Sequence, residues 1–190
     1  MANLIGKHIS LRALEPEDLD FLFSTENNEQ FWEISSTQTP FSKYILKQYI
    51  ENSHQDIYEA KQYRFVISNM ENNPVGMIDL FDFNPQHKRV GIGILLLPKY
   101  QNKGYASEAL DLVIDYVFLY LNVHQIFANI TSDNTKSIAL FEKNNFKIVG
   151  IKKDWIYSNS AYNDEILYQD PTNLYTAEDN DITGFTILIS

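Results

Sequence analysis

The sequence predicts a mixed α/β (α+β) fold, in which helices cover both faces of a central mixed, largely antiparallel sheet. Three strand-like segments joined by short turns, in residues 63–97, predict an antiparallel meander. A long amphipathic segment follows, and strands and helices alternate after it. The 190 residues are the size of one domain, and 44% of them are hydrophobic, which is enough for a sizeable core.

The N-terminal third is expected to contain one strand and two helices. Residues 8–14 (HISLRAL) alternate in polarity, as in an opening strand. Pro16 and the two acidic residues after it indicate a helix start, because proline fits the first turn and acidic side chains favour the positive end of the helix dipole. Residues 39–55 (TPFSKYILKQYIENSHQ) predict the second helix, with Ser42 as its N-cap.

The middle of the chain predicts the meander and then a long helix. The strands are expected at residues 63–68 (YRFVIS), 75–83 (VGMIDLFDF) and 89–97 (RVGIGILLL), and the segments NMENNP and NPQHK between them are typical of turns. Beyond the third strand, apolar side chains recur at the spacing of one helical face. They are Ala106, Ala109, Leu110, Val113, Ile114, Val117, Phe118 and Leu121.

The remaining elements alternate between strand and helix. Residues 124–130 (HQIFANI) predict a strand, and residues 134–145 (NTKSIALFEKNN) predict a shorter helix. Residues 146–157 and 164–169 predict the two last strands. The complete order is then β-α-α-β-β-β-α-β-α-β-β, a mixed sheet with helices on its faces.

We expect residues 1–169 to form a single domain and residues 170–190 to form a C-terminal extension. The extension is acidic, with four Asp and Glu side chains and no Lys or Arg. Pro171 would end the preceding strand. The last residues, GFTILIS, could pair with a sheet edge as another strand, reach a partner subunit, or be disordered.

Composition narrows the function classes. The chain contains no cysteine, which excludes disulfides, a thiol nucleophile and cysteine metal ligands. Its formal net charge of −10 argues against nucleic-acid binding and suits a small cationic or amine substrate, although acidity also serves solubility alone. No stretch approaches the roughly 18 apolar residues of a membrane span, and the first residues lack the pattern of a secretory signal. A cytoplasmic protein is therefore expected.

The segment QNKGYA, residues 101–106, joins a predicted buried strand directly to the long helix. The first N–H groups of such a helix lack partners, and together with the helix dipole they favour an anion such as a phosphate. Gly104 allows the backbone to turn and to approach a ligand, and Lys99 and Lys103 add positive charge. Walker and dinucleotide-binding loops fit worse, because their glycine patterns are absent from this loop. Gly104 could otherwise shape only a turn.

In this context QNKGYA resembles the acetyl-CoA signature Q/R-x-x-G-x-G/A of the GNAT N-acetyltransferase superfamily, with Gln101, Gly104 and Ala106 at the defining positions. The segment SDNTKSIALFEKNNFKIVG resembles a second landmark of the family, an Asn before a helix and an aromatic-Glu-Lys run before a Phe-bearing strand. The start ISLRALEPEDLDFLF is similar to the branch of ribosomal-protein N-terminal acetyltransferases and spermidine N-acetyltransferases. The likeness covers roughly residues 8–169.

The resemblance implies a sheet that splays open between the strand ending near Leu97 and the strand near Phe127, with acetyl-CoA bound there as cosubstrate and no metal. The pantetheine arm would pair with backbone groups of residues 95–97, and the pyrophosphate would meet N–H groups of residues 102–106. Asn134 would bind the pantetheine or acetyl region, or act as an ordinary N-cap. The residues expected to bind the cofactor are Leu95, Leu96, Leu97, Gln101, Asn102, Lys103, Gly104, Tyr105, Ala106, Asn134 and Phe141.

Two groups that the family commonly uses in catalysis are missing from the matching positions. In relatives a tyrosine on the last helix often protonates the leaving thiolate, and Phe141 stands at that position here. Many relatives carry a glutamate as base on the strand before the phosphate loop, and Gly91 stands there. The candidates for a replacement base, any of which could instead be a surface group, are Asp79 and Glu33, with Asp82 and His87 as further candidates.

The resemblance implies an N-acetyltransferase that moves an acetyl group to a primary amine by direct attack of the amine on the thioester. Polyamine-specific relatives carry clustered carboxylates where FWEISSTQTPF keeps only Glu33, so a ribosomal-protein type, acting on a protein N-terminal α-amine or a small amine, is preferred over the polyamine type. Four aromatic residues could shape the acceptor pocket or belong to the core: Phe31, Trp32, Phe41 and Tyr44. A catalytically silent acyl-CoA-binding regulator is the alternative, and a homodimer is the oligomer to expect.

Overall fold

The computed structural model of the chain describes residues 4–35, 39–158 and 160–170. Its centre is a seven-stranded sheet with the strand order β1-β2-β3-β4-β5-β7-β6. Neighbouring strands are antiparallel except for β4 and β5, which run parallel, so the predicted mixed, largely antiparallel sheet is confirmed. The strands are β1 (Ile9–Arg12), β2 (Tyr63–Asn69), β3 (Pro74–Asn84), β4 (Arg89–Leu96), β5 (Gln125–Thr131), β6 (Lys147–Ser158) and β7 (Ala161–Gln169).

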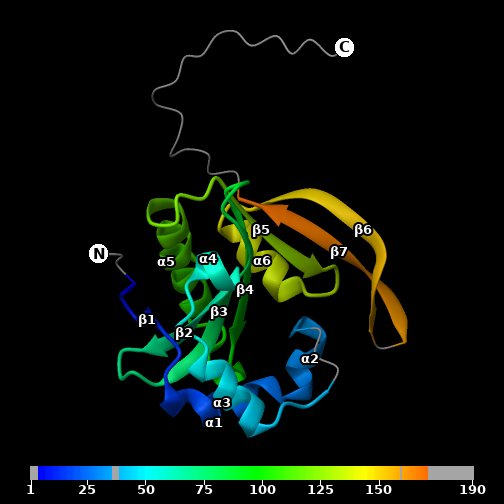
Figure 1. Ribbon diagram of the computed structural model, residues 1–190. Coiled ribbons are helices and arrows are strands. Elements are labelled where there is room, and N and C mark those ends of the chain that lie inside the picture. Colours follow the sequence, from blue (N-terminus) through cyan, green and yellow to red (C-terminus); the bar gives the residue numbers. More distant parts are fainter. Residues whose placement is uncertain (1–3, 36–38, 159, 171–190) are drawn as a thin grey trace, which may run out of the picture.

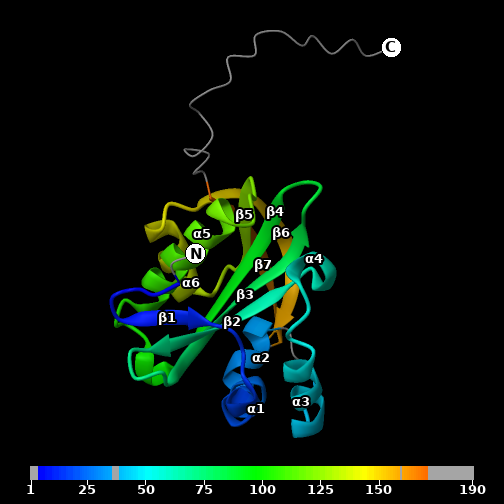
Figure 2. The ribbon, with the colours of Figure 1, turned by 60° about the vertical axis from the view of Figure 1, so that its left-hand side comes forward.

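Helices cover both faces of the sheet, as predicted. α5 and α6 lie over one face, and α1 and α3 pack on the other (Figure 1 and Figure 2). A short 3-10 helix, Pro16–Asp18, precedes α1, and a second one, Pro98–Tyr100, precedes the loop before α5. The α-helices are α1 (Leu19–Glu26), α2 (Glu29–Ser35), α3 (Lys43–Glu51), α4 (Ile57–Ala60), α5 (Tyr105–Leu119) and α6 (Thr135–Lys143).

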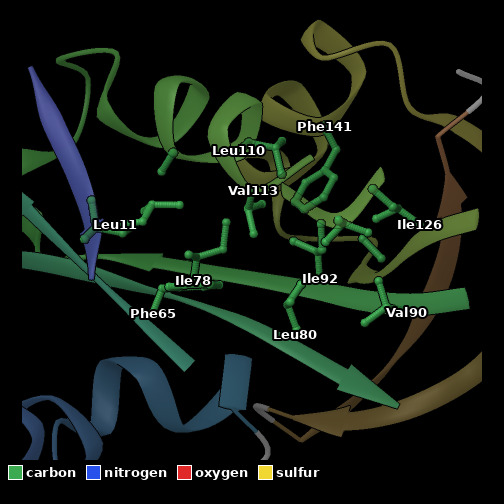
Figure 3. Close-up of a cluster of buried hydrophobic side chains, with 14 of the residues drawn as sticks. Leu11, Phe65, Ile78, Leu80, Val90, Ile92, Leu110, Val113, Ile126 and Phe141 are labelled. Atoms are coloured by element: carbon green, nitrogen blue, oxygen red, sulfur yellow. The ribbon is translucent and has the colours of Figure 1, made fainter. Parts of the chain in front are cut away.

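The larger hydrophobic core fills the space between the sheet and the two helices α5 and α6 (Figure 3). Leu110 and Val113 on the inner stripe of α5 are fully buried, and the strand residues Ile78 and Ile92 belong to the same cluster. Full burial of such a side chain stabilises a fold by roughly 1.5–3 kcal/mol. The stripe therefore anchors α5 firmly on the sheet, and with it the loop that precedes α5.

A smaller core on the opposite face holds α1 and α3 against the sheet. Leu22 of α1 and Ile50 of α3 pack in one cluster with Val66 of β2 and Met77 of β3. All four side chains are less than 8% exposed. This second core fixes the position of the N-terminal helices over the face of the sheet that α5 and α6 leave uncovered.

A partly buried ion pair ties β1 to the start of α1. Nη1 and Nη2 of Arg12 donate hydrogen bonds to the two carboxylate oxygens of Asp18 at 2.6 and 2.8 Å, and the backbone N–H of Glu15 donates to Asp18 Oδ2 at 2.9 Å. Burial raises the pKa of Asp18, but these hydrogen bonds outweigh burial and hold the pKa below its usual value. Asp18 is therefore charged in the folded protein.

The structure contains each strand and each longer helix that the sequence predicts within the described ranges. The Ser42 side chain caps α3 by accepting a hydrogen bond from the backbone N–H of Ile45 at 3.2 Å, as expected. The sequence does not predict α2 and α4, because helices of seven and four residues are too short to show a clear 3.6-residue period. The expected C-terminal strand, GFTILIS, lies outside the described residues.

Candidate functional site

Two neighbouring strands of the sheet separate part-way along their length. β4 pairs with β5 through only three residue pairs, of which Gly91↔Phe127 is the last. Beyond Gly91, β4 continues beside β3 as far as Leu96 but has no β5 partner in the described part of the chain. The backbone of this end of β4 is therefore available to an extended ligand, which could add to it as a strand does.

A cleft of about 540 Å³ lies at this opening. Its walls come from the end of β4, the loop and first turn of α5, one side of α6 along its length, and one residue of α2. The cleft is lined by Phe31, Ile94, Leu95, Leu96, Gln101, Asn102, Gly104, Tyr105, Ala106, Ser107, Asn134, Thr135, Lys136, Ser137, Ala139, Leu140 and Lys143. Three segments that are distant in sequence thus meet around one partly apolar cavity.

The loop before α5 adopts a backbone conformation that only certain residues tolerate. Gly104 has φ +82° and Asn102 has φ +60°, both in the left-handed region. A Cβ built on Gly104 would meet nothing within 4 Å, so the glycine is required for its backbone angle rather than for space. Gly104 is the N-cap of α5 and supplies no side-chain cap, so the first N–H groups of α5 stay available to an anion in the cleft.

Gln101 links the end of β4 to the start of α6 across the cleft. Its Nε2 donates to the backbone carbonyl of Leu96 at 3.1 Å, and its Oε1 accepts from Nζ of Lys136 at 3.0 Å. The sequence identifies Gln101 only as a signature residue. The structure shows that this side chain holds the mouth of the cleft in place.

Asn134 caps α6, because its side-chain oxygen accepts a hydrogen bond from the backbone N–H of Ser137 at 3.1 Å. The N-cap interpretation of Asn134 is therefore confirmed. Asn134 also lines the cleft, and its amide nitrogen makes no hydrogen bond within the described residues. The same side chain can cap the helix with its oxygen and donate to a ligand with its nitrogen.

Eight of the eleven residues expected to bind the cofactor line the cleft. Leu97 and Lys103 do not line it, and the ammonium of Lys103 instead lies 5.3 Å from the centre of the Tyr100 ring. Phe141 points into the hydrophobic core, where it is 2% exposed (Figure 3), and its ring meets Phe146 edge to face at 4.9 Å. Phe141 therefore packs under the cleft rather than along it.

The space beside Gly91 is filled by an aromatic ring. A Cβ on Gly91 would lie 2.3 Å from Cε2 of Phe81, so no larger residue fits beside this ring. Phe81 in turn meets Phe127 edge to face, with ring centres 5.6 Å apart. The rings of Phe81 and Phe127 thus lie beside Gly91, at the point where β4 and β5 separate.

Asp79, the first candidate base, is held by an arginine. Nε and Nη2 of Arg64 donate to the two oxygens of Asp79 at 2.6 and 2.8 Å, and Nη1 donates to Glu26 of α1. Burial lowers the pKa of Arg64, but the carboxylate of Asp79 outweighs burial and raises that pKa. Both oxygens of Asp79 therefore accept hydrogen bonds from a permanent cation, an arrangement that suits positioning better than proton abstraction.

The other candidate bases lie on different elements. Glu33 belongs to α2, and its side chain is outside the described part of the structure. Asp82 occupies an irregularity of β3 with φ +49°, and His87 is exposed in the turn between β3 and β4. Neither Asp82 nor His87 therefore lines the cleft, and neither does Asp79.

The four candidate acceptor residues divide between the cleft and the surface. Phe31 is 7% exposed and lines the cleft. Nε1 of Trp32 donates to the backbone carbonyl of Glu26 at 2.8 Å, which attaches α2 to the end of α1. Phe41 and Tyr44 are 37% and 68% exposed. Only Phe31 of these aromatic residues is thus placed against the cleft.

Sequence reasoning missed the Arg64–Glu26 contact and the meeting of Phe81 with Phe127. An arginine inside the apolar segment YRFVIS was a signal of a buried ion pair, because a buried charge requires a partner. The pairing of the two phenylalanines depends on strand register, for which the sequence gives no signal.

Within the described ranges no group of three or more His, Asp and Glu side chains could hold a metal ion, and no helix there is long and apolar enough to cross a membrane.

Comparison with known proteins gives matches over most of the chain. A family model described as an acetyltransferase (GNAT) domain matches residues 8–147. The spermidine N(1)-acetyltransferase of Vibrio cholerae is 28% identical over 163 residues, which cover 84% of this chain and 91% of that protein. The spermidine N(1)-acetyltransferase of Escherichia coli K12 is 27% identical over 161 residues, which cover 83% of each chain.

Solved structures of spermidine N-acetyltransferases are also similar to this chain. The structure of spermidine N-acetyltransferase from Vibrio cholerae in complex with CoA and spermine superposes with a TM-score of 0.77 at 27% identity, over 85% of this chain and 94% of that one. A dodecameric structure of spermidine N-acetyltransferase from the same organism superposes with a TM-score of 0.74 at 27% identity, over 90% of this chain and 98% of that one. The polyamine branch, which the sequence analysis placed second, is thus the one that these relatives represent.

Proposed function

The chain belongs to the GNAT acetyltransferase family, and on that premise we propose that it acetylates a primary amine of a small polycation such as a polyamine. The transfer of an acetyl group from acetyl-CoA to an amine is the activity of an N-acetyltransferase, and this protein is one. The observation that carries the placement of the cosubstrate is the opening between β4 and β5, which leads directly to the uncapped start of α5.

Acetyl-CoA lies in the cleft with its pantetheine arm along the edge of residues 95–97 that faces away from β3 and its pyrophosphate at the N–H groups of residues 102–106. The helix dipole of α5 and the positive φ of Gly104 support the phosphate placement. Lys136 and Lys143, which line the cleft, add positive charge near the phosphates. Asn134 donates from its amide nitrogen to the pantetheine arm.

The reaction is a direct attack of the amine nitrogen on the thioester carbonyl. The new C–N bond forms, the C–S bond breaks, the amine loses one proton to water, and the CoA thiolate leaves. Phe141 has no proton to donate, so water protonates the thiolate, whose conjugate thiol is weakly acidic, with a pKa of about 8.5 in the comparable cysteine thiol. Alignment of the amine with the thioester supplies most of the rate, because it can lower the barrier by roughly 7–11 kcal/mol.

The charge of the protein supports a cationic acceptor. The chain carries 25 acidic against 15 basic residues. On the face of the sheet opposite α5 and α6, the partly buried cluster of Arg64, Asp79 and Glu26 holds one positive and two negative charges. A polyamine has several ammonium groups, so it gains more from this field than a single α-amine does. The spermidine acetyltransferases among the relatives support the same class of acceptor, a polyamine.

The test is a titration with acetyl-CoA followed by thiol release in the presence of different amines. We expect spermidine and spermine to give kcat/KM at least tenfold above that of a monoamine of equal length and of a peptide with a free N-terminus. Preference for the peptide would reverse the acceptor assignment in favour of the α-amine. Binding of acetyl-CoA without thiol release from any amine would leave only the silent regulator.

We also propose that the protein associates with a second copy of itself through the hairpin of β6 and β7. This hairpin extends away from the body of the molecule (Figure 1) and exposes large apolar side chains: Ile148, Ile151, Trp155, Tyr157 and Tyr162 are 49–65% exposed. Contiguous exposed apolar groups are typical of interfaces, and the dodecameric relative is an assembly of this fold. Light scattering should give a mass above 22.1 kDa.

The Trp155→Lys substitution should shift this mass towards that of the monomer. The matched control is Tyr44→Lys, which changes an aromatic residue that is 68% exposed on α3 and should leave the mass unchanged. A monomeric wild type, or a Trp155→Lys variant of unchanged mass, would rule the hairpin out as the interface.

A further inference from the structure

Three residues on neighbouring strands form a row at the end of the β4–β5 ladder. Phe81 of β3 is the register partner of Gly91 of β4, and Gly91 is the partner of Phe127 of β5. Directly opposed residues in a sheet project from the same face. Their chain neighbours Leu80 and Ile126 lie in the core with α5 and α6, so the row faces the other side of the sheet, on which α1 and α3 pack.

A bare strip of backbone adjoins this row on the same face. The next residue of β4 that faces this side is Gly93, and a Cβ built on it would have only Cε1 of Phe81 within 4 Å, at 3.9 Å. Gly93 has no β5 partner, because the strands have already separated there. Gly93 is partly exposed and thus lies beside the ring of Phe81 on the side opposite the core, where β4 has already separated from β5.

We propose that Phe81 and Phe127 form an aromatic wall of the acceptor site, which holds the methylene chain of the amine against Gly93 and excludes water from its nitrogen. This inference rests on the proposed function, because it requires the thioester to reach the opening from the cleft. It assigns to two apolar residues the task that a carboxylate at the position of Gly91 would otherwise perform.

The chemistry of the attack explains why such a wall is useful. An alkylammonium ion has a pKa of about 10.4 in water, as the lysine side chain has, and it must lose its proton before its nitrogen can attack. Apolar surroundings disfavour the charged form and lower this pKa. The wall thus increases the fraction of bound amine that is neutral, and the released proton goes to water. The ring of Phe81 also excludes the alternative, since no carboxylate fits at Gly91 beside it.

The acidic cluster in the next row directs the amine to the wall. Asp79 is the register partner of Gly93, and its side chain is 36% exposed. Arg64 and Glu26 complete a group with a net charge of −1. The cluster attracts the cationic chain as a whole, while the aromatic wall desolvates the one nitrogen that reacts. A polyamine, whose charges are separated by methylene segments, meets both requirements.

The test measures proton release when spermidine is titrated into the CoA-saturated protein at pH 8, by calorimetry in buffers of different ionisation enthalpy. We expect the wild type to release a measurable fraction of a proton per bound amine beyond the free-amine baseline, and Phe81→Ala to release less than half as much. In kinetic assays of the active protein, the pH at which kcat is half-maximal should be about one unit higher for Phe81→Ala than for the wild type. The pH dependence of kcat reports ionisation in the bound complex. The affinity for acetyl-CoA should not change.

A second variant restores the alternative chemistry. Combining Phe81→Ala with Gly91→Glu removes the ring and places a carboxylate in the vacated space. We expect kcat at pH 7 to recover at least tenfold relative to Phe81→Ala, within the roughly 10²–10⁴-fold effect of a positioned base. Phe83→Leu is the matched control, since Phe83 lies on the same strand but is buried among the core residues, and it should leave proton release and the pH midpoint unchanged.

Wild-type proton release in Phe81→Ala, with wild-type affinity for acetyl-CoA, would overturn the inference. Proton release that depends on Phe81 in a protein that frees no thiol would support the wall and refute the proposed acetyl transfer. The two failures are therefore distinguished by separate measurements.

Discussion

Lys136 of α6 donates a hydrogen bond to the side-chain oxygen of Gln101 over 3.0 Å, across 35 residues of sequence. The nitrogen of the same Gln101 side chain donates to the carbonyl of Leu96 at the end of β4. One amide thus joins the strand, the loop and the second helix that surround the cleft. The contact explains why a glutamine suits the first position of the signature, because its two ends bind partners of opposite polarity.

Replacement of Gln101 by Ala should weaken acetyl-CoA binding by roughly tenfold, since two hydrogen bonds worth about 0.5–1.5 kcal/mol each are lost. Lys136→Met should also weaken binding, because it removes one of these hydrogen bonds and a positive charge that lines the cleft, and calorimetry should show that the double variant binds more weakly than either single variant. Gln125→Ala is the control, because the Gln125 amide bonds Asp170 away from the cleft. Equal affinities in Gln101→Ala and wild type would show that the bridge has no role in binding.

Gly104→Ala should lower the free energy of unfolding by about 1–2 kcal/mol, because the left-handed conformation costs a Cβ-bearing residue that much. It should also weaken acetyl-CoA binding, since relief of the strain moves the first N–H groups of α5. Gly150→Ala is a closely matched control, because a Cβ there also meets nothing within 4 Å but its φ is not positive. Denaturant unfolding of both variants gives the comparison. Equal losses in the two variants would contradict the backbone argument.

Phe141→Tyr places a hydroxyl in the core, where Phe141 is 2% exposed. We expect a loss of roughly 1–3 kcal/mol of stability for a buried polar group without a partner, and an unchanged kcat. The measurement is thermal unfolding together with thiol release. A rise in kcat would mean instead that the hydroxyl reaches the leaving thiolate.

Acid stability should depend on Asp18. Its pKa is lower in the folded than in the unfolded chain, so the unfolded chain takes up the proton first as the pH falls. The stabilisation is complete above the unfolded value of about 3.9 and is lost as the pH falls through the lower folded value. Asp18→Asn should therefore be less stable than wild type at pH 7, and the gap should narrow below pH 4.

The control for this experiment is Asp20→Asn, which changes an aspartate that is 83% exposed and pairs with Lys43 on the surface. Its unfolding temperature should follow that of the wild type throughout the pH range, because exposed ion pairs contribute little. A constant difference between Asp18→Asn and wild type from pH 7 to pH 2 would disprove the linkage.

Local patterns in the sequence were sufficient for most of the fold. The 3.6-residue spacing from Ala106 to Phe118 lies within α5, and the Ser42 cap marks the start of α3. The loop around Gly104 was also predictable, because its glycine meets a specific backbone requirement. In each case the signal and the structure that it specifies lie within a few residues of each other.

The parts of the site that the sequence did not predict depend on contacts between distant residues. Asp79 looks like a free carboxylate in sequence, and only the register of β2 with β3 places Arg64 against it. The meeting of Phe81 with Phe127 likewise follows from the register of three strands and from their separation after Gly91. No local pattern of residue types specifies these pairings, so they required the structure.

Amide hydrogen exchange with and without acetyl-CoA tests the central claim most directly. If the cosubstrate lies between β4 and β5, its binding should slow exchange in residues 94–97 and 102–106 and leave the hairpin of β6 and β7 unchanged. Protection confined to the separate cavity of about 550 Å³ beside Leu14 and Ile50, or no protection in residues 102–106, would contradict the account.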